Sequence, residues 1–310
     1  MRKLWTVIKG FVLFIIVLMI GMYVTGWNGL NDNESLRAEQ SVPQRIQQID
    51  AYTSPYIYMM DRDNGKAVYE KQADAKAYPA SLTKMMTTIV ALEHIEDLSA
   101  NAPVDTETYQ KMVAHNASMA GFYGREAVTY RDLLYGTILP SGGEASNSLA
   151  IHVAGSTNQF VMMMNEKAKE LGMTRTHFMN PEGLHDAKQY TTASDMAMLL
   201  DYALDNQDFR AILTKQSFQT TATADHPQGI ALRSTVLSSL HAEDQKGFEI
   251  LGGKSGTTYE AGQCWATFGT VGNQEYISIV MGAPLEDISH PDRAQKKDTL
   301  RLFAEVVEGR

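Results

Sequence analysis

Ser81-Leu82-Thr83-Lys84 places a hydroxyl and an amine three residues apart at the start of a predicted helix. The apolar residues around it repeat at the spacing of one helix face: Leu82, Met85, Met86, Ile89, Val90 and Leu92. Positions i and i+3 share a helix face, so the Lys84 amine can reach the Ser81 hydroxyl. A serine needs a neighbouring base to act as a nucleophile, and lysine serves only when burial or cations lower its pKa. The stretch indicates a serine–lysine pair; an ordinary surface lysine is the alternative.

Two later stretches carry related chemistry. Ser141-Gly142-Gly143 follows an apolar, helix-like run and a proline, and residues 254–258 (KSGTT) read as a strand edge with a glycine that lets another backbone approach. Each stretch alone is more typical of a turn or an edge strand. In this order, the three stretches resemble the motifs S-x-x-K, S-x-N and K-[ST]-G of active-site serine penicillin-recognising enzymes. The middle motif usually ends in asparagine, and here that position is Gly143.

The resemblance narrows to the low-molecular-mass D-alanyl-D-alanine carboxypeptidases. Their pattern is similar to residues 116–121 (NASMAG), 180–186 (NPEGLHD) and 190–195 (YTTASD), and it covers the chain from Tyr52 onward. This resemblance implies the α+β fold of serine β-lactamases and penicillin-binding proteins. That fold is an antiparallel sheet flanked by helices, with an inserted helical lobe and an active site between lobe and sheet.

The residue pattern independently favours an α+β fold. Residues 56–69 predict a hairpin with a turn at Asn64-Gly65, and helical periodicities dominate residues 106–213. Strand patterns return from Ile250 to Met281, and an amphipathic helix closes the chain. Strands at both ends with helices between them favour α+β, because the last strands are joined too tightly for parallel crossovers.

The resemblance also implies a role for each motif residue. Ser81 would be the nucleophile, Lys84 the general base and Ser141 the proton relay to the leaving amine. The backbone N–H groups of Ser81 and Thr257 would form the oxyanion hole. The substrate carboxylate would be bound by the third motif and by an arginine that aligns loosely with the family: Lys254, Ser255, Gly256, Thr257, Thr258 and Arg293.

The implied activity is that of a serine D-Ala-D-Ala carboxypeptidase. It would remove the terminal D-alanine from peptidoglycan pentapeptide stems through an acyl-enzyme, and β-lactams would acylate the same serine. One alternative is a serine β-lactamase, for which Glu170 and Glu182 are the positional candidates for a deacylating glutamate. Another is a catalytically weak wall-binding protein, suggested by Gly143. We expect Gly143→Asn to raise acylation efficiency by ~1–2 kcal/mol, the scale of one hydrogen bond to a charged partner.

The N-terminus predicts a membrane anchor or a signal segment. Residues 11–24 are continuously apolar and follow Arg2, Lys3 and Lys9. With Trp27 as an interfacial residue, the segment approaches the ~20 residues that span a bilayer. We find no small-x-small cleavage site, which favours an uncleaved anchor at residues 1–27 over a secreted form. Residues 28–50 read as a polar tether, and 51–310 as the peptidase domain outside the cytoplasmic membrane.

Composition excludes several other classes of function. The net charge is −9 and no basic run occurs, which argues against nucleic-acid binding. The histidines show no pair at metal-ligand spacing, so we expect neither a metal nor a cofactor. His185 reads as structural. Cys264 is the only cysteine and reads as a small buried hydrophobe rather than a nucleophile.

Overall fold

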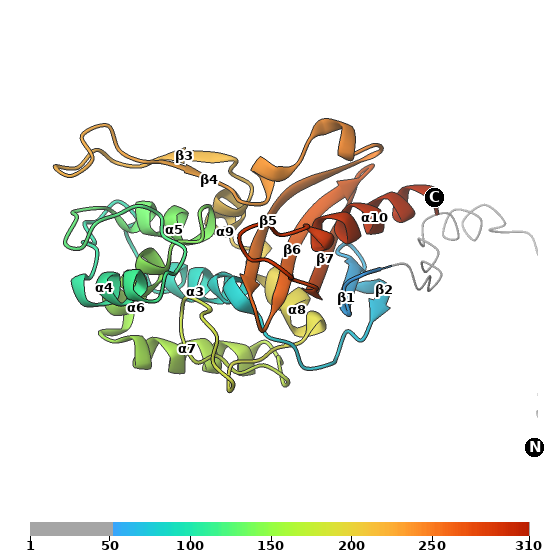
Figure 1. Ribbon diagram of the computed structural model, residues 1–310, viewed down its shortest axis with the longest axis horizontal. Helices are drawn as coiled ribbons and strands as arrows, with labels where there is room; N and C mark the ends of the chain where they lie inside the picture. The colour runs from blue at the N-terminus through green and yellow to red at the C-terminus, as the bar shows by residue number, and fades with distance from the viewer. Residues whose placement is uncertain (1–51, 310) are drawn as a thin grey trace, which may run out of the picture. The chain divides into compact units, whose positions relative to one another are not determined.

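The computed structural model describes residues 52–309 (Figure 1). The predicted anchor at 1–27 and the tether at 28–50 lie outside the described residues. None of the helices in the described part of the chain is both long and apolar enough to cross a membrane.

A five-stranded antiparallel sheet forms one half of the domain (Figure 1). Its strands are β1 (Tyr56–Asp61), β2 (Lys66–Lys71), β5 (Phe248–Thr258), β6 (Gly262–Val271) and β7 (Gln274–Ala283). Their order is β2-β1-β7-β6-β5, so the first strand of the described chain pairs with the last. β5 is an edge strand, and it carries the KSGTT sequence. The predicted α+β class and hairpin are confirmed.

Side chains of β7 alternate between two hydrophobic cores. Tyr276 and Val280 lie with Phe303 of α10 (Ala294–Glu308), which covers one face of the sheet. Ile277 and Ile279 belong to the core on the other face, which α8 (Ala193–Leu204) covers. This alternation follows from the two-residue period of a strand. Burial of each such side chain stabilises the fold by roughly 1.5–3 kcal/mol, so both faces are firmly covered.

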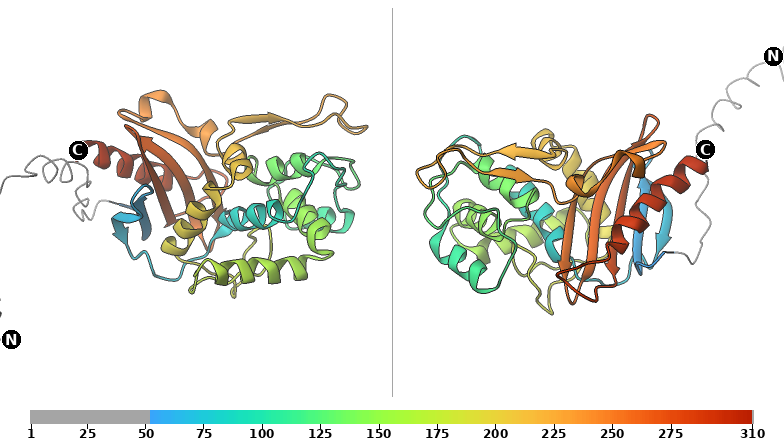
Figure 2. Two further views of the ribbon diagram at one scale, coloured as in Figure 1. Left: turned by 180° about the vertical axis from the view of Figure 1, so that it is seen from behind. Right: turned by 45° about the horizontal axis from the view of Figure 1, so that its top comes forward.

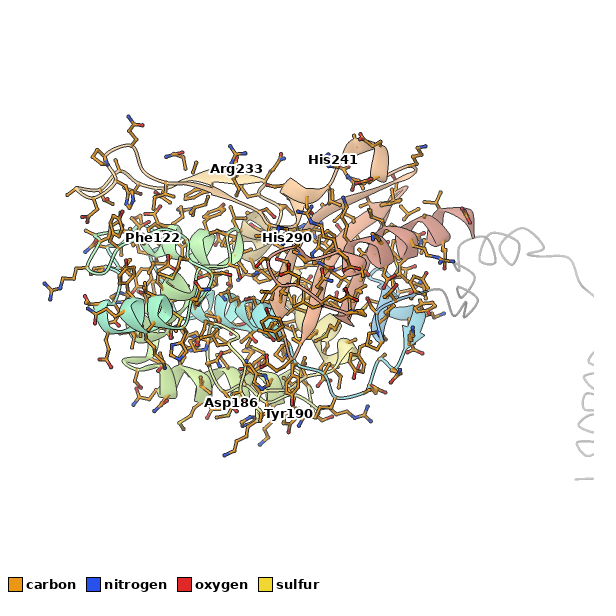
Figure 3. The ribbon with its side chains drawn as sticks, in the orientation of Figure 1. Phe122, Asp186, Tyr190, Arg233, His241 and His290 are labelled. Carbon is orange, nitrogen blue, oxygen red and sulfur yellow. The ribbon has the colours of Figure 1, made fainter. Side chains whose placement is uncertain are left out.

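The helical lobe lies beside the sheet and is inserted between β2 and β5 (Figure 2). Its helices are α3 (Thr83–Leu92), α4 (Thr106–Ala114), α5 (Tyr130–Ile138), α6 (Gly143–Ala154) and α7 (Thr157–Glu170), followed by α9 (Gln207–Leu213) after α8. Thr129 and Asp132 form a capping box at the start of α5. The loop between α7 and α8 carries the NPEGLHD sequence, and Figure 3 labels Asp186 and Tyr190 within it.

A two-stranded hairpin was not anticipated from the sequence. β3 (Ser217–Gln219) pairs with β4 (Ala231–Arg233), and the hairpin runs along α5 (Figures 1 and 2). Phe218 stacks on Tyr135 with ring centroids 3.8 Å apart, and the Thr221 N–H donates to Asp132 Oδ1 at 3.0 Å. Three-residue strands are too short to produce a readable period, which explains the omission.

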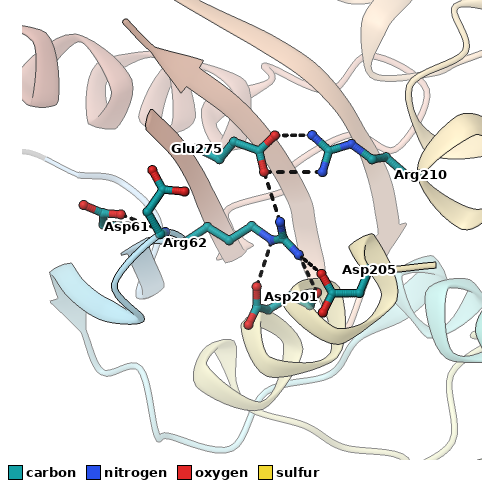
Figure 4. Close-up of polar contacts among 7 residues, drawn as sticks. Asp61, Arg62, Asp201, Asp205, Arg210 and Glu275 are labelled. Carbon is teal, nitrogen blue, oxygen red and sulfur yellow. Dashed lines mark hydrogen bonds and ion pairs between the residues drawn. The ribbon is translucent and has the colours of Figure 1, made fainter. Parts of the chain in front are cut away.

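Charged residues join the sheet to α8 and α9 (Figure 4). Arg62, which follows β1, lies 2.9 Å from Asp201 Oδ1 and 3.1 Å from Glu275 Oε2, and it also pairs with Asp205. Glu275 of β7 pairs in turn with Arg210 of α9. The two arginines hold the pKa of Glu275 below its usual range. The network therefore ties both helices to one end of the sheet.

Candidate active site

Ser81 and Lys84 meet at the first turns of a helix, as predicted. Ser81 lies in a short 3-10 turn, Ala80–Leu82, that leads into α3. Lys84 Nζ donates to Ser81 Oγ at 3.1 Å and also to the backbone oxygen of Glu182. Lys84 is only 2% exposed, and burial lowers its pKa to about 8 although the charges of Glu182 and Glu144 raise it. A minor fraction of the amine is therefore neutral near pH 7 and able to accept a proton.

The backbone around Ser81 is tightly constrained. Ala80 has a φ of 46°, in the left-handed region that non-glycine residues seldom adopt. Gly183 has a φ of 85°, and a Cβ there would lie 2.1 Å from the oxygen of Ala80. A Cβ on Gly256 of β5 would lie 2.9 Å from the Ser81 nitrogen. Only glycines permit the loop and the strand to approach the Ser81 backbone from two sides, which fixes its position.

Lys254 and Ser141 form a second lysine–serine pair. Lys254 of β5 donates from Nζ to Ser141 Oγ at 2.9 Å and to the Ser255 oxygen at 2.7 Å. Lys254 is fully buried, and burial together with the charge of Lys84 lowers its pKa well below the usual value. Ser141 has a φ of 68°, a strained conformation of the kind that clusters at functional sites. The structure thus brings all three sequence motifs together.

The first pair borders a cavity of about 540 Å³, whereas Ser141, Lys254, Ser255 and Gly256 are not among the residues that line it. Ser81, Lys84, Thr257 and Thr258 line it. Its wall also includes residues from the matched flanking segments and from neighbouring loops: His115, Asn116, Ala117, Ser118, Gly143, Glu182, Gly183, Leu184, His185, Tyr259, Glu260 and Ile288. Tyr259 is 65% exposed, which places its ring at the mouth rather than in the interior. The volume suits a short peptide end or a drug-sized molecule.

Two predicted substrate-binding residues, Ser255 and Arg293, do not line the cavity, whereas His185 does. Ser255 Oγ forms a 2.7 Å hydrogen bond with Thr235 Oγ1. Arg293 is exposed at the start of α10, its N–H donates to Gln263 Oε1 at 3.1 Å, and it is not among the residues that line the cavity. His185 lines the cavity wall and packs edge-on against Tyr78, with ring centroids 4.8 Å apart.

Cys264 is completely buried, as predicted. Burial raises the pKa of its thiol to about 12, so the thiolate form needed for nucleophilic attack is absent near neutral pH. Of the two glutamates considered for deacylation, Glu170 is exposed on α7 and pairs with Lys167 at 2.8 Å. Glu182 is 4% exposed and lines the cavity. Only Glu182 therefore belongs to this site.

The surroundings of Gly143 change one expectation from the sequence. A Cβ at this position would lie 2.8 Å from Met112 Sδ, 3.2 Å from Met112 Cγ and 3.3 Å from the Ser118 oxygen. Met112 of α4 is fully buried and occupies the space that a side chain would need. The expected gain from Gly143→Asn does not follow from this packing, because the asparagine would first have to displace the methionine.

The next residue, Glu144, is also fully buried. Its Oε1 accepts hydrogen bonds from the N–H groups of Ala120 at 2.7 Å and Gly121 at 3.0 Å, and burial raises the pKa of its carboxyl. Glu144 therefore anchors the segment that leads away from the cavity-lining residues 116–118.

Comparisons with known proteins agree with this geometry. A family model described as D-alanyl-D-alanine carboxypeptidase (peptidase S11) matches residues 40–285. The D-alanyl-D-alanine carboxypeptidase DacC of Escherichia coli (strain K12) is 32% identical over 74% of this chain and 56% of its own length. DacF of Bacillus subtilis (strain 168) is 28% identical over 75% of this chain and 58% of its own length. The chain thus spans a little over half the length of these two relatives.

Solved structures show the same fold. The Streptomyces K15 DD-transpeptidase superimposes with a TM-score of 0.73 at 28% identity, covering 83% of this chain and 98% of that one. A D-alanyl-D-alanine carboxypeptidase from Mycobacterium tuberculosis H37Rv gives a TM-score of 0.71 at 25% identity, covering 86% of this chain and 94% of that one. With the family match over residues 40–285 and the three converging motifs, the chain belongs to the D-alanyl-D-alanine carboxypeptidase family of peptidases.

Proposed function

We propose that this protein is a serine D-Ala-D-Ala carboxypeptidase that trims peptidoglycan pentapeptide stems. One observation carries the proposal: two buried lysines, Lys84 and Lys254, each hydrogen-bond a serine, the charge of Lys84 acts on Lys254, and the Ser81–Lys84 pair lines the cavity. Burying two lysine side chains close to each other is costly for a fold, so their presence is best explained by chemistry. The family membership supports the same activity.

In the first step, Ser81 Oγ attacks the carbonyl carbon of the penultimate D-alanine while Lys84 Nζ takes its proton. The N–H groups of Ser81 and Thr257 stabilise the oxyanion. The carbon–nitrogen bond then breaks, and the proton held by Lys84 reaches the departing amine through Ser141, which Lys254 orients at 2.9 Å. In the second step, water attacks the ester, Lys84 takes a proton from the water, and this proton passes to the Ser81 oxygen as the ester bond breaks.

Substrate binding would use the cations and hydroxyls at the end of β5. Thr257 and Thr258 line the cavity and offer donors to the terminal carboxylate, and Lys254 precedes them on the same strand. β-Lactams present a carboxylate and a reactive carbonyl at a similar separation, so they would acylate Ser81. The role of Arg293 stays a prediction, because its exposed position at the start of α10 leaves it outside the cavity lining.

The test is covalent labelling with a fluorescent penicillin, combined with release of D-alanine from a peptide ending in D-Ala-D-Ala. We expect the wild type to gain one penicillin mass on the peptide that contains Ser81, and Ser81→Ala to lose both activities while it keeps its melting temperature. Labelling of Ser81→Ala would overturn the assignment. Rapid, repeated hydrolysis of nitrocefin without release of D-alanine would favour the β-lactamase alternative.

Transpeptidation is a second candidate, because the Streptomyces K15 DD-transpeptidase matches this chain over 98% of the K15 chain's own length. Transfer would occur if an amine, rather than water, attacked the acyl-enzyme. Adding an amino-acid acceptor to the peptide assay and separating the products by mass distinguishes transfer from hydrolysis.

We further propose that residues 1–27 anchor the peptidase domain to the outer face of the cytoplasmic membrane. The cationic residues before an apolar run at 11–24 support this orientation. The full-length protein should then fractionate with membranes and keep its first residues. Recovery of a soluble form that begins after about residue 27 would favour a cleaved signal segment.

A further inference from the structure

Lys84 is held from two directions. Its Nζ donates to Ser81 Oγ at 3.1 Å, and its second acceptor is the backbone oxygen of Glu182, from the loop between α7 and α8. That loop is fixed to the helices beneath it, since Thr87 Oγ1 of α3 donates to the Pro181 oxygen at 2.6 Å. The position of residue 182 therefore sets the position of the Lys84 amine.

The side chain of Glu182 is buried in the same place. It is 4% exposed and lines the cavity that contains Ser81 and Lys84. Its Oε2 accepts a hydrogen bond from Asn147 Nδ2 at 3.1 Å, and the same amide donates to the Gly143 oxygen at 2.9 Å. Asn147 is 2% exposed, so both side chains are shielded from water and hydrogen-bond each other instead. A buried carboxylate held in this way needs a physical reason, because its desolvation is costly.

Helix α6 cannot reach Lys84 with a side chain from position 143. Gly143 has none, and Met112 fills the adjoining space. Asn147 lies one turn further along the same helix and its amide reaches Glu182 directly. Through Asn147, α6 therefore contacts the residue whose backbone oxygen holds Lys84.

The charges around Lys84 come from three elements. The loop contributes Glu182, α6 contributes Glu144, and β5 contributes Lys254. Four further titratable groups line the same cavity: His115, His185, Tyr259 and Glu260. Of the acidic groups, Glu182 has the largest effect in raising the pKa of Lys84, ahead of Glu144, while burial lowers it more strongly.

We propose that Glu182, anchored by Asn147, is the positioning residue for Lys84, and that its charge sets how much of the lysine is protonated. The backbone oxygen of residue 182 fixes the amine, the Asn147 amide fixes residue 182, and the carboxylate stabilises the ammonium form. The inference deepens the proposed acyl-transfer function and rests on it for its kinetic consequences. Glu182 is not assigned contact with the reacting atoms.

The first test is the pH profile of acylation by a labelled penicillin, measured from about pH 5.5 to 9. Glu182→Gln keeps a group that can accept from Asn147 but removes the charge. We expect the maximal acylation rate (the plateau) of Glu182→Gln to stay near that of the wild type. The midpoint of its pH profile should fall by about 0.5–1 pH unit, because the variant lacks the neighbouring carboxylate that favours the charged lysine. Asn147→Ala should lower the plateau about 10-fold, because the loop that fixes Lys84 loses its anchor.

The matched control is Glu260→Gln. Glu260 lines the same cavity, but it lies at the β5–β6 turn and its side chain is 45% exposed. The midpoint of the pH profile of acylation in Glu260→Gln should equal that of the wild type. A Glu182→Gln enzyme that is slower by the same factor at every pH, with an unmoved midpoint, would show a merely structural role and overturn the proposal. An unchanged plateau in Asn147→Ala would overturn the anchoring.

The second test needs no substrate. Protein labelled with ¹³C at the lysine Cε is titrated by NMR, and the Lys84 signal is assigned by its loss in Lys84→Arg. We expect the Lys84 midpoint to be lower in Glu182→Gln than in the wild type, and equal midpoints would overturn the proposal. Failure of the wild type to react with penicillin would instead contradict the proposed function, and the NMR result would still decide this inference.

Discussion

Replacing Gly143 with asparagine inserts a side chain into space that Met112 occupies. The new Cβ would lie 2.8 Å from the Met112 Sδ and 3.3 Å from the Ser118 oxygen. Overpacking of this kind costs about 1–3 kcal/mol. For a domain of this size each kcal/mol shifts the melting temperature by about 2–4 °C, so Gly143→Asn should melt about 2–12 °C below the wild type. Acylation should fall with it, because Gly143 lines the cavity.

A double-mutant cycle tests whether Met112 is the cause. Met112→Ala alone should cost about 2–5 kcal/mol by leaving a cavity. The combination with Gly143→Asn should cost less than the sum, with a coupling of about 1–3 kcal/mol, because the asparagine then has room. Thermal melts and penicillin-labelling rates of the four proteins provide the measurement. If Gly143→Asn alone melts like the wild type and acylates faster, Met112 moves aside freely and the packing argument is wrong.

Three further outcomes follow from the structure. Gly183→Ala should unfold at least about 5 °C earlier and label slowly, since its Cβ would lie 2.1 Å from the Ala80 oxygen; a normal melt would contradict the constraint. Lys84→Met should raise stability at pH 7 by about 1–3 kcal/mol while abolishing labelling, because the folded state holds the lysine pKa at about 8 against 10.5 when unfolded. The unfolded state then binds more protons between those pH values, so the advantage in urea melts should shrink from pH 8 to 10.5 and be constant below pH 8. Glu275→Gln should destabilise by about 1–2 kcal/mol, less at 1 M salt, and an effect independent of salt would argue against the ion-pair network.

Local periodicity explains which parts of the site were predictable. The Ser81 helix and the KSGTT strand carry their pattern within a few residues, and the terminal strands identify the fold class. Packing of side chains distant in sequence carries no such pattern. Met112 reaches Gly143 from another helix, and Asn147 reaches Glu182 across 35 residues. The sequence singled out Glu182 by its place in NPEGL and as a positional candidate for deacylation, and it offered no sign that an asparagine would be its partner.

The hydrogen bonds of the site also make it a reporter of folding. Lys84 and its acceptor on residue 182 are 98 positions apart, and Lys254 and Ser141 are separated by 113. Contacts of such long range form late, since the intervening chain must first be ordered. A chain whose lobe and sheet have not docked has a serine at position 81 but no activated nucleophile. Penicillin labelling during refolding should therefore count native molecules, and its time course should follow the slowest packing step rather than the formation of helices.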